Sequence, residues 1–173
     1  LMVETGSLEV LNILANASAT IAEGEVLQLT VSRDISTDEE IYLKVIRVKT
    51  AALFSAATQV GAVISGSEET IINALYKYGD ALGVAFQIVD DLLDVVGYSR
   101  IIGKNNGDDF RERKLTLPFI KAISSCNQNE KDFWKRTIEK GDQTSEDFDT
   151  ALELMQKYKA IDRTRLDALK WAK

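Results

Sequence analysis

Three aspartates interrupt an otherwise apolar stretch, "ALGVAFQIVDDLLDVVG" (residues 81–97), at Asp90, Asp91 and Asp94. On a helix with about 100° per residue, Gln87 and Asp94 lie on the side of Asp90, and apolar residues occupy most of the rest. Carboxylates grouped in an apolar setting repel one another unless a cation lies between them. Mg²⁺ prefers carboxylate oxygens and often shares its coordination shell with a substrate phosphate. The stretch therefore predicts a magnesium site or, alternatively, carboxylates that cap a helix or pair with basic residues.

The polar face of this predicted helix is narrow, which leads to a second expectation. A helix on the surface of a protein normally has a wide polar face, whereas here the apolar residues surround a narrow polar strip. We therefore expect other helices to surround this segment and the aspartates to point toward an internal cavity.

A lysine interrupts an apolar stripe in the preceding helix. The residues that share the face of Lys49 are apolar, and Thr50 places a hydroxyl beside the ammonium group; the apolar residues are Val45, Ala52, Leu53, Ala56 and Val60. Such a lysine either binds an anion or extends its charged end to the rim of the apolar surface.

Two further lysines follow: Lys104 lies in the segment "GKNNGDD", and Lys114 lies ten residues later. Gly103 and Gly107 give this backbone the freedom to approach a ligand closely. Taken alone the segment is a weak phosphate signal, because it lacks the spacing of a P-loop.

The elements that must position these residues are helices, so the predicted fold class is all-α. Apolar residues recur at helical spacing along the chain, and no alternating strand pattern extends beyond a few residues. Gly66 is expected to end one helix and Ser67 to cap the next. The predicted helices span residues 7–30, 37–66, 68–96, 115–125, 129–140, 145–158 and 162–172. Residues 97–114 form a long irregular stretch, which in a compact domain is usually functional or disordered.

Composition limits the classes of function. The chain has 173 residues, no histidine and a formal charge of −6, and its basic residues are dispersed, which argues against a nucleic-acid partner. Cys126 is the only cysteine, so we expect a reducing, cytoplasmic setting. No apolar run has the length of a membrane-spanning helix, and the first residues lack the pattern of a signal peptide. The chain lacks an initial methionine and enters helical pattern almost at once, as if it began partway through a fold.

Four segments in this order, "KTAALFSAA", "GVAFQIVDDLLD", "GKNNGDD" and "KLTLPFI", closely resemble the C-terminal half of the all-trans polyprenyl diphosphate synthases. The bacterial long-chain enzymes that make octaprenyl and decaprenyl side chains for ubiquinone and other quinones are nearest, through "AEGEVLQL" and "GKNNGDD". The resemblance implies a bundle of long helices around a deep cavity, and it makes "DDLLD" the second of the family's two aspartate-rich motifs. It further implies a homodimer.

The resemblance also implies a chemistry and a set of roles. The family condenses an allylic diphosphate with isopentenyl diphosphate, and cations clamp the diphosphate that leaves. Asp90 would bind Mg²⁺ directly, and Asp91 and Asp94 would contribute directly or through water. The remaining roles fall on residues that would bind the allylic diphosphate or stabilise the developing cation: Lys49 and Lys104 for the diphosphate, Thr50 and Gln87 beside the reacting carbon, Lys114 near the mouth, and Glu25 and Gln28 along the cavity. At Arg113 this chain departs from the family, which commonly has glycine there.

The resemblance leaves the first aspartate-rich motif and the isopentenyl diphosphate site without counterparts in this sequence. We therefore expect residues 1–173 to be the C-terminal part of a single synthase domain, and a polypeptide of these residues alone to be inactive. Two alternatives remain at this point. One is a non-catalytic or regulatory subunit of a heteromeric synthase, and the other is a helical interaction module without a ligand.

Overall fold

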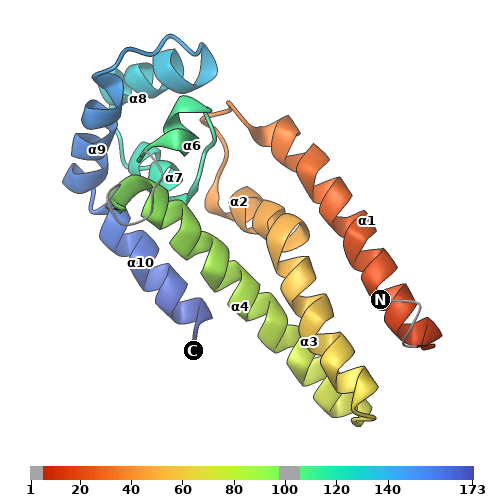
Figure 1. Ribbon diagram of the computed structural model, residues 1–173. Helices are drawn as coiled ribbons and strands as arrows, with labels where there is room; N and C mark the ends of the chain where they lie inside the picture. Colours follow the sequence, from red (N-terminus) through yellow and green to blue (C-terminus); the bar gives the residue numbers. More distant parts are fainter. Residues whose placement is uncertain (1–5, 98–105) are drawn as a thin grey trace. The chain divides into compact units, whose positions relative to one another are not determined.

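The computed structural model describes residues 6–97 and 106–173, and all regular elements in these ranges are helical (Figure 1). The all-α class is thus confirmed. The elements are α1 (Leu8–Val31), α2 (Glu39–Ile46), η2 (Arg47–Ala51), α3 (Ala52–Ile64), α4 (Glu69–Val96), α6 (Asp108–Arg111), α7 (Leu117–Ile123), α8 (Gln128–Trp134), η3 (Lys135–Glu139), α9 (Asp147–Lys157) and α10 (Ala160–Trp171). No helix in the described part of the chain is long and apolar enough to cross a membrane.

The predicted helix boundaries agree with the structure to within two residues, with three internal exceptions. The helix predicted at residues 129–140 ends in a π-helical segment, η3. The helix predicted at residues 37–66 is not regular, because a π-helical turn, η2, joins α2 to α3. The stretch predicted as irregular at residues 97–114 contains a short helix, α6, which begins after Gly107. Gly107 adopts a left-handed φ of 82°, and a Cβ there would lie 2.6 Å from the ring of Phe148, so only glycine fits this position.

The chain divides into two compact units. The first contains Leu1–Leu29, Leu43–Gln87 and Trp171–Lys173, and the second contains Thr30–Tyr42 and Ile88–Lys170. The helices α1, α2, α4 and α10 each contribute residues to both units. That residues 1–173 belong to a single synthase domain stays a prediction.

Close helix contacts at glycines hold the first unit together. A Cβ on Gly24 of α1 would lie 2.7 Å from the backbone nitrogen of Lys49, and one on Gly83 of α4 would lie 2.5 Å from the Cα of Ala51. Gly79 similarly faces the backbone of Phe54 in α3. Side chains at these positions would push the helices apart, so the glycines permit α1 and α4 to contact the η2–α3 segment backbone to backbone.

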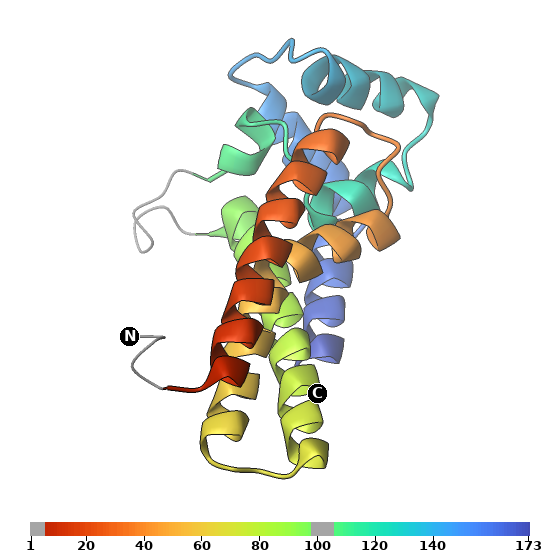
Figure 2. The same ribbon diagram turned by 90° about the vertical axis from the view of Figure 1, so that its right-hand side faces the viewer.

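The turn between α3 and α4 confirms one prediction and corrects another (Figure 2). Gly66 ends α3 with a left-handed φ of 69°. The amide of Ser67 donates to the carbonyl of Ala62, and the amide of Gly66 donates to the carbonyl of Val63. These are the two hydrogen bonds of a Schellman motif. The hydroxyl of Ser67 lies 2.8 Å from the hydroxyl of Ser65, and the amide of Ile71 donates to the Glu68 carbonyl instead. Ser67 thus follows the turn without the predicted capping bond.

The second unit has a core of aromatic and aliphatic side chains. Trp134 lies at its centre, completely buried, with the rings of Phe110, Phe119 and Phe133 within 6.4 Å of its ring centroid. The other buried members come from α4 and from α7 to α10: Val95, Ala122, Ile123, Cys126, Ile138, Ala151, Met155 and Ala160. This core fixes the C-terminal end of α4, which carries the aspartates.

Candidate functional site

Lys49 and Thr50 both lie in η2, the π-helical turn of the first unit. Such turns are rare and often occur at functional sites. The Lys49 ammonium donates to Oε1 of Gln28 at 2.6 Å and lies 3.1 Å from Oε1 of Glu25, both on α1. The Lys49 side chain is 31% exposed and is paired with these two groups. The structure brings three of the predicted residues together, and Gly24, through its close contact with η2, makes the approach of α1 possible.

Thr50 contacts another predicted residue across the first unit. Its hydroxyl donates to Oε1 of Gln87 on α4 at 2.8 Å. Because the proton is used in this bond, the lone pairs of the Thr50 oxygen remain available to a positively charged group. The pair predicted to lie beside a reacting carbon is thus in direct contact.

The three aspartates of α4 have different environments in the second unit. Asp90 is exposed, Asp91 is only 5% exposed, and Asp94 is half-buried. The buried hydroxyl of Tyr42 on α2 donates to Oδ2 of Asp91 at 2.6 Å. Burial and the neighbouring Asp91 carboxylate raise the pKa of Tyr42 well above its ordinary value of 10.0, so the hydroxyl keeps its proton.

Asp94 binds the backbone at the start of α6. Its Oδ1 accepts from the amide of Asp108 at 3.1 Å and its Oδ2 from that of Asp109 at 3.2 Å. Burial is the largest influence and raises the pKa of the Asp94 carboxyl, while these two amide bonds act in the opposite direction. Asp94 therefore caps α6. Helix capping was one of the alternatives that the sequence left open for these carboxylates.

Asp109 adds a fourth carboxylate that the sequence analysis did not single out. Burial first, and then the nearby Asp94, raise its pKa to about 6, and Asp90 acts in the same direction. Lys114 compensates in part: its ammonium lies 3.7 Å from Asp109 and 2.5 Å from Glu112. The sequence pattern did not indicate Asp109, because it lies beside Asp94 in space but fifteen positions away along the chain.

These carboxylates fit a divalent cation that keeps water and phosphate ligands. Within residues 6–97 and 106–173, no three carboxylate, cysteine or histidine side chains converge as a preformed metal cage. Mg²⁺ does not need one, since it is usually held by one or two carboxylates, several waters and substrate phosphates. The exposed Asp90, together with a buried neighbourhood that disfavours the negative charge of Asp109, provides such a setting.

One expectation about the site is wrong, and another concerns residues that the structure does not describe. The expectation that other helices surround α4 is wrong for this chain, because Leu82, Phe86, Val89 and Leu93 are each 39–53% exposed. Their spacing places them in one stripe along the helix. Lys104 and Gly103 lie outside the described residues, so their predicted contact with a diphosphate has no structural counterpart here.

Comparison with known proteins assigns the chain to a family. A family model described as polyprenyl synthetase matches residues 1–155, so the chain belongs to the polyprenyl synthetase family. Octaprenyl diphosphate synthase of Haemophilus influenzae is 41% identical over 162 residues, which are 94% of this chain and 49% of that protein. Octaprenyl diphosphate synthase of Escherichia coli is 42% identical over 141 residues, 82% of this chain and 44% of that protein. The chain spans about half the length of the curated relatives it matches.

Solved structures show the same fold. A decaprenyl diphosphate synthase from Rhodobacter capsulatus is 60% identical with a TM-score of 0.92, covering 98% of this chain and 52% of that one. A polyprenyl synthase from Caulobacter crescentus, crystallised with calcium and isoprenyl diphosphate, is 48% identical with a TM-score of 0.95, covering 99% of this chain and 52% of that one. The chain therefore has the helical fold of the polyprenyl synthases, as the resemblance implied.

Proposed function

We propose that the intact protein is a prenyltransferase that condenses an allylic diphosphate with isopentenyl diphosphate and makes a long-chain all-trans polyprenyl diphosphate. The family assignment and the names of the relatives, octaprenyl and decaprenyl diphosphate synthase, support this reaction. The observation that carries it is the Lys49–Thr50 pair in a π-helical turn, with Thr50 bonded to Gln87, because these are the groups that the reaction needs near an ionising carbon. A quinone side chain is the proposed use of the product.

The first unit supplies the groups that would bind and stabilise the allylic substrate. Lys49 would exchange its contacts with Glu25 and Gln28 for diphosphate oxygens, and Gln28 would then be free to donate its amide protons to the same ligand. The oxygens of Thr50 and Gln87 would face the positive charge that develops when the C–O bond breaks.

The second unit supplies the groups that would hold the metal. Asp90 is the proposed direct ligand because it is exposed, while Asp91 and Asp94 would contribute through water or directly from positions fixed by Tyr42 and the start of α6. Lys114 and, by resemblance, Lys104 would add positive charge near the diphosphate. Bound Mg²⁺ would offset the negative charge on the leaving diphosphate. The Caulobacter synthase, with its calcium and isoprenyl diphosphate, supports this pairing of cation and substrate.

A homodimer in the cytoplasm is the proposed setting, and it rests on the family rather than on a contact in this structure.

The test is elongation by the intact protein. Radiolabelled isopentenyl diphosphate, farnesyl diphosphate and Mg²⁺ should give long all-trans products, and chelation of Mg²⁺ should abolish them. If the intact protein yields no product alone but yields product once a second synthase subunit is added, the regulatory-subunit alternative is correct. Replacing Lys49 with Met should reduce product formation by at least tenfold, since one charge-assisted contact to phosphate is lost.

A further inference from the structure

We infer that Tyr42 is a positioning residue for the "DDLLD" motif: its hydroxyl holds the Asp91 carboxylate, and ion pairs of Lys121 fix the helix turn that carries Tyr42. The inference rests on the proposed function, since it concerns how the proposed metal site is kept in place. Neither the sequence pattern nor the roles implied by the resemblance pointed to Tyr42 or Lys121.

The hydrogen bond from Tyr42 fixes the orientation of the Asp91 carboxylate. The two residues are 49 positions apart, both are about 95% buried, and their oxygens are 2.6 Å apart. A buried carboxylate that accepts a bond from a phenol is restricted to a narrow range of rotations about its side-chain bonds. Asp91 immediately follows Asp90 on α4, so a fixed Asp91 limits rotation and displacement of this part of the helix.

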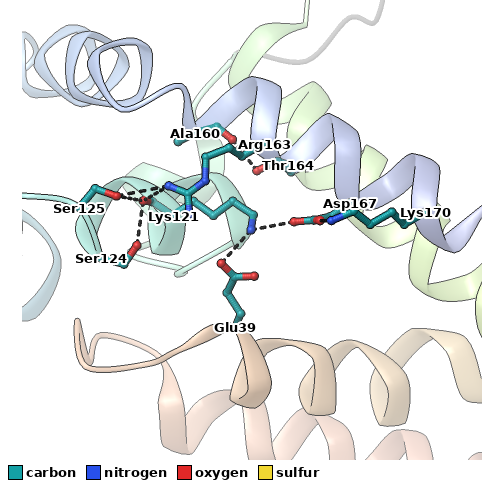
Figure 3. Close-up of polar contacts among 9 residues, drawn as sticks. All are labelled: Glu39, Lys121, Ser124, Ser125, Ala160, Arg163, Thr164, Asp167 and Lys170. Carbon is teal, nitrogen blue, oxygen red and sulfur yellow. Dashed lines mark hydrogen bonds and ion pairs between the residues drawn. The ribbon is translucent and has the colours of Figure 1, made fainter.

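The first turn of α2 is itself anchored. Figure 3 shows the Lys121 ammonium between Glu39, the first residue of α2, and Asp167 of α10, with both carboxylates at 2.7 Å. The Lys121 side chain is only 5% exposed, whereas its partners Glu39 and Asp167 are 45% and 21% exposed, so the burial is on the lysine side of these ion pairs. Arg163 of α10 extends the network, because its guanidinium donates to the Lys121 carbonyl and to the Ser125 hydroxyl.

These contacts form one connected path within the second unit. Tyr42 lies three residues after Glu39, which is less than one helical turn, so a constraint on Glu39 restricts the position of the Tyr42 ring. The path runs from α10 through Lys121 to α2 and, through the Tyr42 hydroxyl, to Asp91 on α4. It explains why a lysine is buried in α7: removal of its charge would leave the Glu39 and Asp167 carboxylates close together without a cation between them.

The experiment compares two substitutions that each remove one phenol–carboxylate bond. Tyr42→Phe keeps the ring and removes the bond to Asp91. Tyr158→Phe is the matched control in the same unit, because the Tyr158 hydroxyl donates to Glu130 Oε2, also at 2.6 Å, and Glu130 is not part of the proposed metal site. Each intact variant is titrated with Mn²⁺ and inorganic pyrophosphate together, followed by calorimetry and by the spin-resonance signal of free Mn²⁺.

Tyr42→Phe should weaken joint binding of Mn²⁺ and pyrophosphate about tenfold, the equivalent of one hydrogen bond to a charged group. It should also raise the Mg²⁺ concentration for half-maximal elongation while the KM for isopentenyl diphosphate stays constant. Tyr158→Phe should lower Tm and leave Mn²⁺–pyrophosphate binding unchanged. If Tyr42→Phe binds like the parent, or if both variants lose affinity equally, the positioning role is refuted.

A second variant covers the case in which Tyr42→Phe does not fold. Glu39→Ala removes the anchor of α2 while Lys121 keeps its ion pair with Asp167. We then expect Mn²⁺–pyrophosphate binding to weaken at least twofold, and unchanged binding would overturn the inference. Failure of the proposed function is separate and visible in the parent, which would then neither bind Mn²⁺ with pyrophosphate nor elongate farnesyl diphosphate.

Discussion

At the scale of single residues, the aspartates of α4 divide their tasks by their surroundings. Asp91 accepts from Tyr42 and Asp94 accepts from two backbone amides, whereas the carboxylate of Asp90 is exposed. Asp90→Ala should therefore weaken the joint binding of Mg²⁺ and pyrophosphate by at least a hundredfold, since a direct ligand and a full charge are lost. Calorimetric titration of the intact protein measures this, and parent-like binding by the variant would show that Asp90 is not the ligand.

Arg113 gives a prediction about stability that is independent of the reaction. It adopts a left-handed φ of 60°. A left-handed conformation costs a residue with a Cβ about 1 kcal/mol relative to glycine. Arg113→Gly should consequently be more stable than Arg113→Ala by about that amount in chemical denaturation. Equal stabilities, or a more stable alanine variant, would contradict the account of this turn.

Residue types and spacing singled out candidate residues for the site, but they did not reveal the partners that these residues have in the fold. Lys49, Thr50, Gln87 and the aspartates stand out locally, because each is a polar group in apolar surroundings. Tyr42 has no such signal, since a tyrosine in an amphipathic helix is unremarkable until the fold places it 2.6 Å from Asp91. Contacts between residues that are far apart in the sequence depend on tertiary packing, which periodicity does not encode.

At the scale of helices, the close approach of α1 to η2 determines what surrounds Lys49. Gly24→Ala should destabilise the protein by about 2 kcal/mol, because the added methyl meets the backbone of Lys49 at 2.7 Å and a backbone cannot move aside cheaply. Gly61→Ala is the control: nothing lies within 4 Å of a Cβ there, so this helical position should gain up to about 1 kcal/mol. Thermal unfolding of both variants checks the pair, and a stabilised Gly24→Ala would refute the contact.

The junction of η3 and α9 gives a prediction of acid sensitivity. The Arg136 guanidinium binds both oxygens of the buried Asp147, at 2.5 and 3.0 Å, and this bond lowers the Asp147 pKa from 3.8 to about 2. A carboxyl whose pKa is lower in the folded state stabilises the fold above pH 3.8 and loses that contribution as the pH falls toward 2.

In thermal unfolding the parent should exceed Asp147→Asn in Tm at pH 6, and the difference should shrink between about pH 4 and pH 2. Asp149→Asn, an exposed substitution on the same helix, should show no such convergence. A constant difference between parent and Asp147→Asn across this range would mean that the ion pair is not the source of the stability.

Helix boundaries were predictable because apolar periodicity and glycine mark them. The π-helical turn was not, since apolar periodicity does not reveal an inserted residue. Leu53, expected on the apolar face of Lys49, is 54% exposed. The helix α6 was missed because only four residues form it, and its start is held by Asp94 rather than by a local cap.

At the scale of the whole molecule, the apolar stripe of α4 predicts association. Leu82, Phe86, Val89 and Leu93 are exposed at helical spacing, and exposed apolar surface of this kind tends to be covered by another protein surface. Sedimentation of the 173-residue polypeptide at micromolar concentration should show a dimer or a larger species. Leu93→Lys should shift the distribution toward monomer, because association would then bury an unpaired charge. Leu166→Lys, at a leucine of α10 that is 58% exposed and lies outside the stripe, should leave the distribution unchanged. A monomer for the parent sequence would remove the basis for this interface and would count against the proposed homodimer.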